Sequence, residues 1–142
     1  MADGETLPAV LKRLLEATNA HDLEALTECF AVDYSNETPA HPDRNFMGRE
    51  QVRRNWARIF AGVPDLHAEL VRWIAGGDTF WAEWQHRGTS VDGRPHEMAG
   101  VTVIGVRDDN IRWARFYLEP VLRDGIDVEA AIRGAMAGDA SR

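Results

Sequence analysis

The chain has 142 residues, a formal net charge of -7 and a pI near 5.2. This acidity argues against nucleic-acid binding, because affinity for a phosphate backbone comes mostly from clustered Lys and Arg. The length suits one domain that buries a core without disulfides, so the single Cys29 is expected to be a buried thiol. With no apolar run long enough to span a membrane and no secretory signal pattern, we expect a cytoplasmic protein that does not enter the membrane.

The first half of the sequence predicts three amphipathic helices. Apolar residues recur at helical spacing in residues 7–15 and again in residues 23–30. Residues 32–37 read as a short strand, and the loop at 38–47 contains two prolines, which remove backbone donors. A third helix is expected from residue 48 or 49 to residue 63, where Pro64 stops it. Its buried stripe comprises Val52, Trp56, Ile59, Phe60 and Val63.

Residues 66–119 predict a meander of four antiparallel strands. Alternating apolar residues are interrupted by turn sequences at 76–78, 91–94 and 108–110. If Asp92-Gly93 is a two-residue hairpin loop, Val91 pairs with Arg94 and Glu83 pairs with Thr102. Directly paired residues share a face. One face then comprises Trp81, Glu83, Gln85, Arg87, Met98, Gly100, Thr102 and Ile104, and the other Phe80, Ala82, Trp84, His86, Ala99, Val101 and Val103.

Several local motifs accompany this order of elements: Tyr34-Ser35-Asn36, Gly48-Arg49-Glu50-Gln51-Val52, Phe60, Gly93-Arg94 and residues 111–120. Together they resemble the cone-shaped α+β fold of the nuclear transport factor 2-like superfamily, which includes SnoaL-like polyketide cyclases, ketosteroid isomerase and limonene epoxide hydrolase. The resemblance implies N-terminal helices packed on a strongly curved, mostly antiparallel sheet, a deep internal pocket and a homodimer across the outer sheet face. We therefore divide the chain into a SnoaL-like domain at 1–125 and a C-terminal helical appendage with a frayed end at 126–142.

The register of the last strand has two alternatives. A two-residue loop at Asp109-Asn110 would place Thr102 opposite Tyr117, whereas a three-residue loop with Asn110 in the left-handed region would place Thr102 opposite Phe116. The second alternative agrees with the family's pattern. It predicts an apolar pocket lining of Ile59, Val63, Met98, Phe116 and Leu118.

Tyr34 and Asn36 look like the tyrosine and asparagine that position the attacking water in the epoxide hydrolase. Two residues apart on a strand, they point to one side. Alternatively, the Tyr34 hydroxyl is tied to backbone and Asn36 caps a turn. That hydrolase also needs a relay of a carboxylate, an arginine and a second carboxylate on its strands. This chain does not reproduce the relay, because the corresponding positions are Gln85, Glu83 and Phe116. The proton-shuttling aspartate of the isomerase aligns with Asn36, which cannot take a proton.

Glu83 is therefore the principal candidate for a general acid or base. Beside Trp81 on a pocket face, a carboxylate would lose hydration, which would raise its pKa toward neutrality. Alternatively, Glu83 forms an ion pair with Arg87 or Arg115, or lies at a dimer face. His96 at the end of the same face is a candidate proton shuttle, the alternative being a solvent-exposed histidine at the hairpin end.

These residues predict a pocket for a small, largely apolar or aromatic ligand, with cofactor-independent acid-base chemistry of the cyclase, isomerase or hydrolase type. The alternative is a non-catalytic binding or dimeric interaction module that has lost the relay. The spacing of the five histidines predicts no metal site, and there is no nucleotide-binding motif. The expected catalytic residues are Glu83, Tyr34, Asn36 and His96, and the expected substrate-binding residues are Gln85, Trp81, Trp56, Ile59, Val63, Met98, Phe116 and Leu118.

Overall fold

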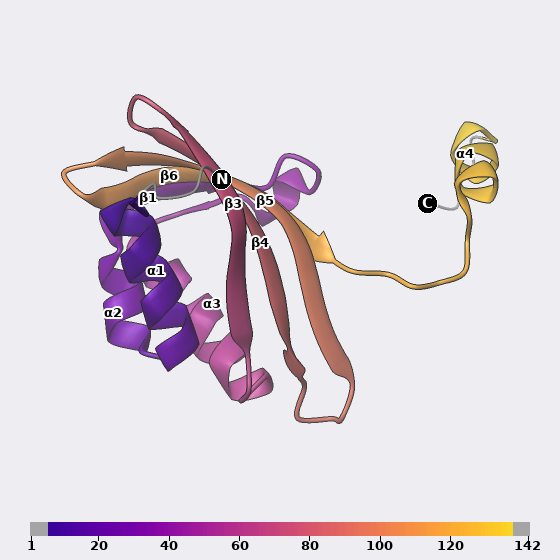
Figure 1. The fold of residues 1–142 in the computed structure, drawn as a ribbon, viewed down its shortest axis with the longest axis horizontal. Helices are drawn as coiled ribbons and strands as arrows, with labels where there is room; N and C mark the ends of the chain where they lie inside the picture. Colours follow the sequence, from indigo (N-terminus) through magenta and orange to yellow (C-terminus); the bar gives the residue numbers. More distant parts are fainter. Residues whose placement is uncertain (1–5, 138–142) are drawn as a thin grey trace.

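The computed structural model describes residues 6–137 and confirms the expected α+β fold. Helices α1, α2 and α3 gather on one side of a curved sheet, and α4 stands apart from it (Figure 1). The helices are α1 (Ala9–Ala20), α2 (Leu23–Glu28), α3 (Arg49–Gly62) and α4 (Val128–Met136), with a 3-10 turn η1 (Pro42–Arg44). The strands are β1 (Phe30–Glu37), β2 (Phe46–Met47), β3 (His67–Gly76), β4 (Thr79–Thr89), β5 (Pro95–Arg107) and β6 (Asn110–Pro120).

The six strands form a single sheet in the order β2-β1-β6-β5-β4-β3. Strand β1 runs parallel to β6, and all other neighbours are antiparallel. The sheet curves around the helices (Figure 1), so its concave face and the inner sides of α1 to α3 enclose the core. The predicted four-strand meander is confirmed as β3 to β6.

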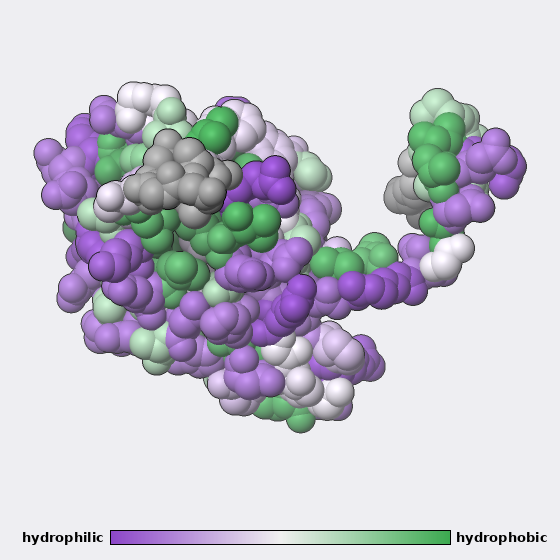
Figure 2. Space-filling view, in the orientation of Figure 1, coloured by the Kyte–Doolittle hydropathy of each residue, from purple (hydrophilic) through white to green (hydrophobic). Residues whose placement is uncertain are grey.

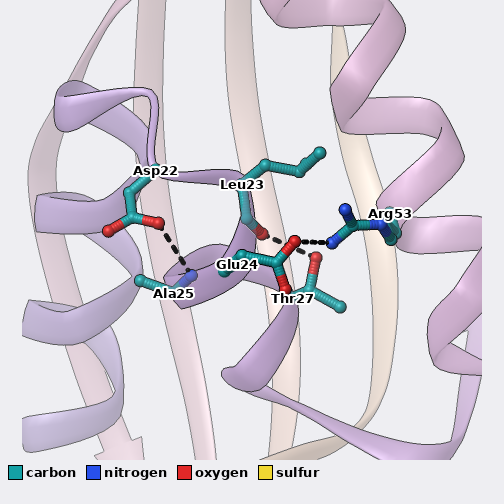
Figure 3. A network of polar contacts seen from close by, with 6 residues as sticks. All are labelled: Asp22, Leu23, Glu24, Ala25, Thr27 and Arg53. Carbon is teal, nitrogen blue, oxygen red and sulfur yellow. Dashed lines mark hydrogen bonds and ion pairs between the residues drawn. The ribbon is translucent and has the colours of Figure 1, made fainter.

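Short helix α2 is held in place by polar contacts at both of its sides. The Asp22 side chain accepts a hydrogen bond from the Ala25 N–H at 3.0 Å, which caps the helix. Glu24 forms an ion pair with Arg53 of α3 (Figure 3). Because a helix of six residues is not stable alone in water, its position depends on this capping and on burial of Leu26.

The end of α1 is fastened to the start of the meander. The Asn19 side chain accepts a hydrogen bond from the Ala68 N–H at 2.7 Å and donates one to the Ala68 carbonyl at 3.0 Å. His21 follows in the left-handed region, and its ring nitrogen lies 2.8 Å from the Leu66 carbonyl oxygen. These bonds hold the end of α1 at a fixed distance from strand β3. They therefore set one edge of the space between the helices and the sheet.

The hairpin between β4 and β5 differs from the prediction by one residue. Its loop spans residues 90–94, so that Thr89 pairs with Pro95, His86 with Met98 and Glu83 with Val101. The predicted pairs of Val91 with Arg94 and of Glu83 with Thr102 are therefore wrong. Because strand side chains alternate, a shift of one residue exchanges which residues of β4 share a face with Met98 and Thr102.

Contacts outside the loop explain its length. The Val91 N–H donates to the Gly62 carbonyl at the end of α3 at 2.9 Å, and the Thr89 N–H donates to the Asp65 carboxylate at 2.7 Å. Within the loop, the Ser90 N–H donates to the Arg94 carbonyl at 2.8 Å. The hairpin end is thus fixed to α3 and the following turn instead of closing at Asp92-Gly93.

The turn between β5 and β6 differs from the predicted turn, although the predicted pairing of the two strands is correct. Asp108 and Asp109 form a two-residue loop, with positive φ angles of 53° and 65°, so the predicted three-residue loop is wrong. An irregularity between Gly105 and Val106 then shifts the pairing by one residue. Thr102 consequently pairs with Phe116, as predicted.

Beyond β6 an extended segment leads to α4, which stands clear of the rest of the molecule in Figure 1. This helix lies in the segment predicted as a C-terminal helical appendage, and its apolar residues Val128, Ile132 and Met136 have exposed side chains. Figure 2 shows apolar surface along the extended segment and α4. The frayed end predicted for residues 139–142 lies outside the described residues. No helix among residues 6–137 is long and apolar enough to cross a membrane.

Candidate functional site

A cavity of about 520 Å³ lies between the concave face of the sheet and α3. Strands β1, β4, β5 and β6 supply one wall, α3 supplies the other, and η1 with its flanking loop contributes to the rim. The lining residues are Phe30, Tyr34, Asn36, Thr38, Arg44, Phe46, Gln51, Val52, Asn55, Trp56, Ile59, His86, His96, Met98, Phe116, Leu118 and Glu119.

Tyr34 and Asn36 form a buried polar pair on β1. The Tyr34 hydroxyl donates a hydrogen bond to Asn36 Oδ1 at 2.7 Å, and the tyrosine side chain is 1% exposed. Burial raises the pKa of Tyr34 far above its usual value, so the phenol remains protonated and remains a donor. This bond leaves the Asn36 amide nitrogen, with its two N–H donors, available on a residue that lines the cavity.

The helix wall carries a second amide. Gln51 Nε2 donates to Asn55 Oδ1 at 2.7 Å, and Gln51 Oε1 accepts from Arg54 at 2.7 Å. The side-chain oxygens of Gln51 and Asn55 therefore both accept hydrogen bonds within α3. Asn55, like Asn36, is left with N–H groups to offer to the cavity. The cavity thus has hydrogen-bond donors on its sheet wall and on its helix wall.

Two histidines face the cavity from the β4-β5 hairpin. His86 is 8% exposed, and its ring lies 6.2 Å from the ring of Trp56 and 6.2 Å from that of Trp84, measured between centroids. Burial in this aromatic setting, with a smaller contribution from His96, lowers the pKa of His86 from 6.5 to about 4. His86 is therefore a neutral imidazole at pH 7. His96, paired with Gly88 at the hairpin end, lines the same cavity.

The rim is charged. Glu119 at the end of β6 lies 3.0 Å from the ring nitrogen of His41, and Arg44 of η1 lines the cavity beside them. The Thr38 N–H donates to the Asn45 side chain at 2.7 Å, which closes the loop that bears His41 and Arg44. Charged groups thus lie at the rim, while the interior is mostly aromatic and aliphatic.

Three of the expected site residues lie on the opposite face of the sheet, as a consequence of the one-residue shift in the β4-β5 hairpin. Trp81 is 52% exposed there. Glu83 Oε1 forms an ion pair with Arg72 Nε of β3 at 3.0 Å, and Gln85 Oε1 accepts a hydrogen bond from Arg87 at 3.0 Å. The expectation that Glu83, Gln85 and Trp81 project into the pocket is wrong.

Val63 is buried but does not line the cavity. It is the C-cap residue of α3 and packs against the backbone of Gly88, where an added Cβ would approach its Cγ1 to 2.5 Å. The helix ends before this residue, so Val63 fills the junction of α3 with β4 instead of extending the helix wall. The remaining expected residues do line the cavity: Tyr34, Asn36, His96, Trp56, Ile59, Met98, Phe116 and Leu118.

Several lining residues were not expected from the sequence. His86 was assigned to the opposite face by the incorrect hairpin register, and a five-residue loop would have corrected it. Phe30 and Phe46 were not assigned, although their rings flank Tyr34, at 4.9 Å and 6.0 Å between centroids. Asn55 had a usable signal, because it lies three residues after Val52 and four before Ile59, at the spacing that shares a side of a helix. In the described part of the chain, no group of three or more His, Cys, Asp and Glu residues could hold a metal ion.

Solved structures share this architecture. A protein from Catenulispora acidiphila with a ketosteroid isomerase-like fold, solved with trimethylamine, is 22% identical over 79% of this chain and 87% of its own, with a TM-score of 0.66. A candidate isomerase from Bacillus subtilis is 20% identical over 78% and 84%, with a TM-score of 0.69. A candidate polyketide cyclase from Sinorhizobium meliloti is 19% identical over 80% and 95%, with a TM-score of 0.61.

At these identities the likeness shows the fold, which is that of the nuclear transport factor 2-like proteins. No curated protein matches the sequence. The family model of the SnoaL-like domain matches residues 11–115, a span that includes α1 except its first two residues, α2, α3, strands β1 to β5, the first part of β6, and most of the cavity lining. The chain therefore belongs to the SnoaL-like domain family.

Proposed function

We propose that the protein binds a small, largely apolar carbonyl compound in the cavity and catalyses proton transfer next to the carbonyl group, without a cofactor. Such a step begins both cyclisation and isomerisation. The observation that carries the proposal is the arrangement of the lining: amide donors and two histidines surround a space whose other walls are aromatic and aliphatic. A cavity of about 520 Å³ is within the range that holds a ligand with one or two rings.

The apolar walls supply binding energy and exclude water. Phe30, Trp56, Met98, Phe116 and Leu118 offer a surface on several sides of a bound ring system. Burying apolar surface contributes roughly 25 cal/mol per Å² before the costs of association are subtracted. Removing water from the site also strengthens each polar contact within it.

The polar groups suit a developing enolate. When a base removes a proton from the carbon beside the carbonyl, the electron pair moves onto the carbonyl oxygen. Either the Asn36 amide, fixed by Tyr34, or the neutral ring of His86 can donate a hydrogen bond to that oxygen. His96 is the proposed base, because it lines the same cavity from the hairpin end and its imidazole nitrogen can accept a proton.

The reaction is completed when the enolate carbon attacks a second carbonyl, as in cyclisation, or takes a proton at another position, as in isomerisation. His96 would return its proton in either case. The similar solved structures described as a candidate polyketide cyclase and a candidate isomerase support this general class at the level of fold. The proposal assigns no role to Glu83, which faces away from the cavity and pairs with Arg72.

Exchange of ketone hydrogens with solvent deuterium tests the proposal without knowledge of the natural substrate. Incubation of 1-tetralone and related cyclic ketones with the protein in D2O, followed by proton NMR, should show catalysed loss of the signals next to the carbonyl. His96→Gln should reduce the exchange rate by about 10²-fold or more, as removal of a general base typically does. Glu83→Gln is the matched control and should retain it. Equal rates in His96→Gln and the parent protein would contradict the assigned base.

A non-catalytic binding module is the second candidate. Two observations favour it: Glu119 is the one carboxylate in the described lining, where it is engaged by His41, and the low pKa of His86 makes that residue a weak base. Saturable binding of the same ketones, measured by quenching of tryptophan fluorescence, with no deuterium exchange would select this candidate.

We also propose that the protein is a homodimer through the outer face of the sheet. Ile74, Trp81 and Tyr117 expose large apolar side chains, and the first two pair directly on β3 and β4. Surfaces of this kind are often covered by a partner. Light scattering coupled to size-exclusion chromatography should give the mass of two chains, and Trp81→Glu should lower it to one. A monomeric parent protein would overturn the proposal.

A further inference from the structure

A second, smaller space, here named the inner pocket, adjoins the main cavity and shares lining residues with it, among them His86. We infer that the inner pocket is a subsite for a short alkyl group of the ligand, such as a methyl or ethyl branch. The inference rests on the proposed function, since it concerns the ligand of the same cavity. It defines the ligand as a ring system with an oxygen at one side and a one- or two-carbon branch at another.

The two spaces share a junction. Phe30, Trp56, His86, Phe116 and Leu118 line both the main cavity and the inner pocket. The residues that line the inner pocket alone come from the deepest part of the fold: Leu14 and Thr18 of α1, Trp84 of β4, Thr102 and Ile104 of β5, and Ile111 and Ala114 of β6. A ligand in the main cavity would therefore reach the inner pocket past the His86 ring.

The floor of the inner pocket is fixed by the sheet. Ile104 pairs directly with Ala114 across β5 and β6, and both side chains are 2% exposed. Ala114 also pairs with Asn36 of β1. Its small side chain, between larger neighbours, leaves space that a branched residue would occupy. Ala114 thereby controls the depth of the pocket.

The polar groups around the inner pocket are mostly engaged with one another. Trp84 Nε1 donates to Thr102 Oγ1 at 2.9 Å, and the Thr18 hydroxyl donates to the Leu14 carbonyl at 2.7 Å. The polar positions that remain are the hydroxyl proton of Thr102, the unused lone pairs of the two hydroxyl oxygens and a ring nitrogen of His86 at the junction. The other residues that line the pocket are aromatic or aliphatic, so we expect it to favour carbon over water.

The size of the pocket sets the size of the group. Its volume is about 50 Å³, against about 520 Å³ for the main cavity. Only a small group fits such a space, and we assign it one or two carbons. Each methylene group moved from water into such a site should strengthen binding by about fourfold.

A series of 4-alkylphenols tests the inference. Phenol, 4-methylphenol, 4-ethylphenol, 4-propylphenol and 4-butylphenol would be titrated against the full chain by isothermal calorimetry. For the parent protein we expect affinity to rise by about fourfold per carbon up to 4-ethylphenol, and then to stop rising or to fall. Affinity that does not depend on chain length would overturn the inference.

Two variants alter the inner pocket in opposite directions. Ala114→Val adds two carbons to the floor and should abolish the gain from phenol to 4-ethylphenol. Ile104→Val removes one carbon and should extend the gain to 4-propylphenol; this conservative change also keeps the test valid if Ala114→Val does not fold. Ile59→Val is the control, because Ile59 lines only the main cavity, and it should leave the length dependence unchanged. A length dependence unaffected by Ile104→Val would overturn the assignment.

Xenon separates failure of this inference from failure of the proposed function. In a xenon-pressurised crystal of the parent protein, an atom should occupy the inner pocket and disappear in Ala114→Val. An ordered water in place of xenon would overturn the inference and leave the proposed function standing. Xenon in the inner pocket with no phenol binding would support the apolar subsite and count against the proposed function.

Discussion

The buried imidazole of His86 should make the stability of the protein depend on pH. In the folded state its pKa is about 4, whereas the ordinary value is 6.5. Between these values the unfolded chain binds a proton at this residue and the folded chain does not, so stability falls as the pH falls. The contribution is constant above pH 6.5, decreases through the interval, and stays lost below pH 4.

The size of the effect follows from the shift. At about 1.4 kcal/mol per pKa unit, the full difference is about 3 kcal/mol, of which about 2 kcal/mol is lost by pH 5. Carboxylates add their own pH dependence at the acid end, so the effect of His86 must be isolated by difference. His86→Gln keeps a polar side chain there but cannot be protonated.

Urea unfolding of both proteins, followed by tryptophan fluorescence at one protein concentration, gives the free energy of unfolding at each pH. The parent protein should lose about 2 kcal/mol more than His86→Gln between pH 7.5 and pH 5. His67→Gln, at an exposed histidine of the adjacent strand, controls for loss of a histidine as such. Parallel curves for the parent protein and His86→Gln would refute the burial of a neutral imidazole at this position.

The remaining predictions concern the same wall of the cavity. His96→Gln should raise the pKa of His86, measured by NMR of the imidazole, because His96 contributes to its depression; an unchanged or lower value would show that the two rings are not coupled. Tyr34→Phe should cost about 1–3 kcal/mol of stability in urea unfolding, since Asn36 Oδ1 loses its buried donor, and a neutral effect would contradict that hydrogen bond. Gly100→Ala should destabilise by more than about 2 kcal/mol, because Gly100 has a φ of 147° and an added Cβ would lie 2.1 Å from the Tyr117 carbonyl oxygen. Gly76→Ala, where a Cβ meets nothing within 4 Å, should stay within about 0.5 kcal/mol, and similar losses in the two variants would refute the close approach.

Much of the fold followed from periodicity. The apolar stripes of α1 and α3 and the alternation in β3 to β6 are local patterns that the burial of one face imposes on a sequence. Tyr34 and Asn36 were placed correctly on one side of a strand, because side chains two residues apart on a strand share a face. Their hydrogen bond to each other was not foreseen, since either could have bonded to backbone instead.

The hairpin register could not be read from Asp92-Gly93 alone. The loop is held open by bonds from Val91 to the end of α3 and from Thr89 to Asp65, which belong to segments distant in the chain. That single difference placed Glu83 outside the cavity and His86 inside it. An error of one residue in a loop therefore moved every expected site residue on β4, namely Trp81, Glu83 and Gln85, to the wrong face of the sheet.

For β5 and β6, by contrast, the predicted loop was wrong but the predicted pairing was correct. The sequence predicted Phe116 opposite Thr102 through a three-residue loop, whereas the chain has a two-residue turn at Asp108-Asp109 followed by an irregularity after Gly105. Both routes add one residue to β6 relative to β5. The cavity lining by Phe116 and Leu118 depended on that count and not on where the extra residue lies.

Ligands should bind on the face of β4 that carries His86, and not on the face that carries Glu83. Intermolecular NOE measurements on the protein with bound 4-ethylphenol can distinguish the two faces. We expect contacts from the ethyl protons to the His86 ring and to Phe116. Contacts to Trp81, which shares the face of Glu83, with none to His86, would contradict it.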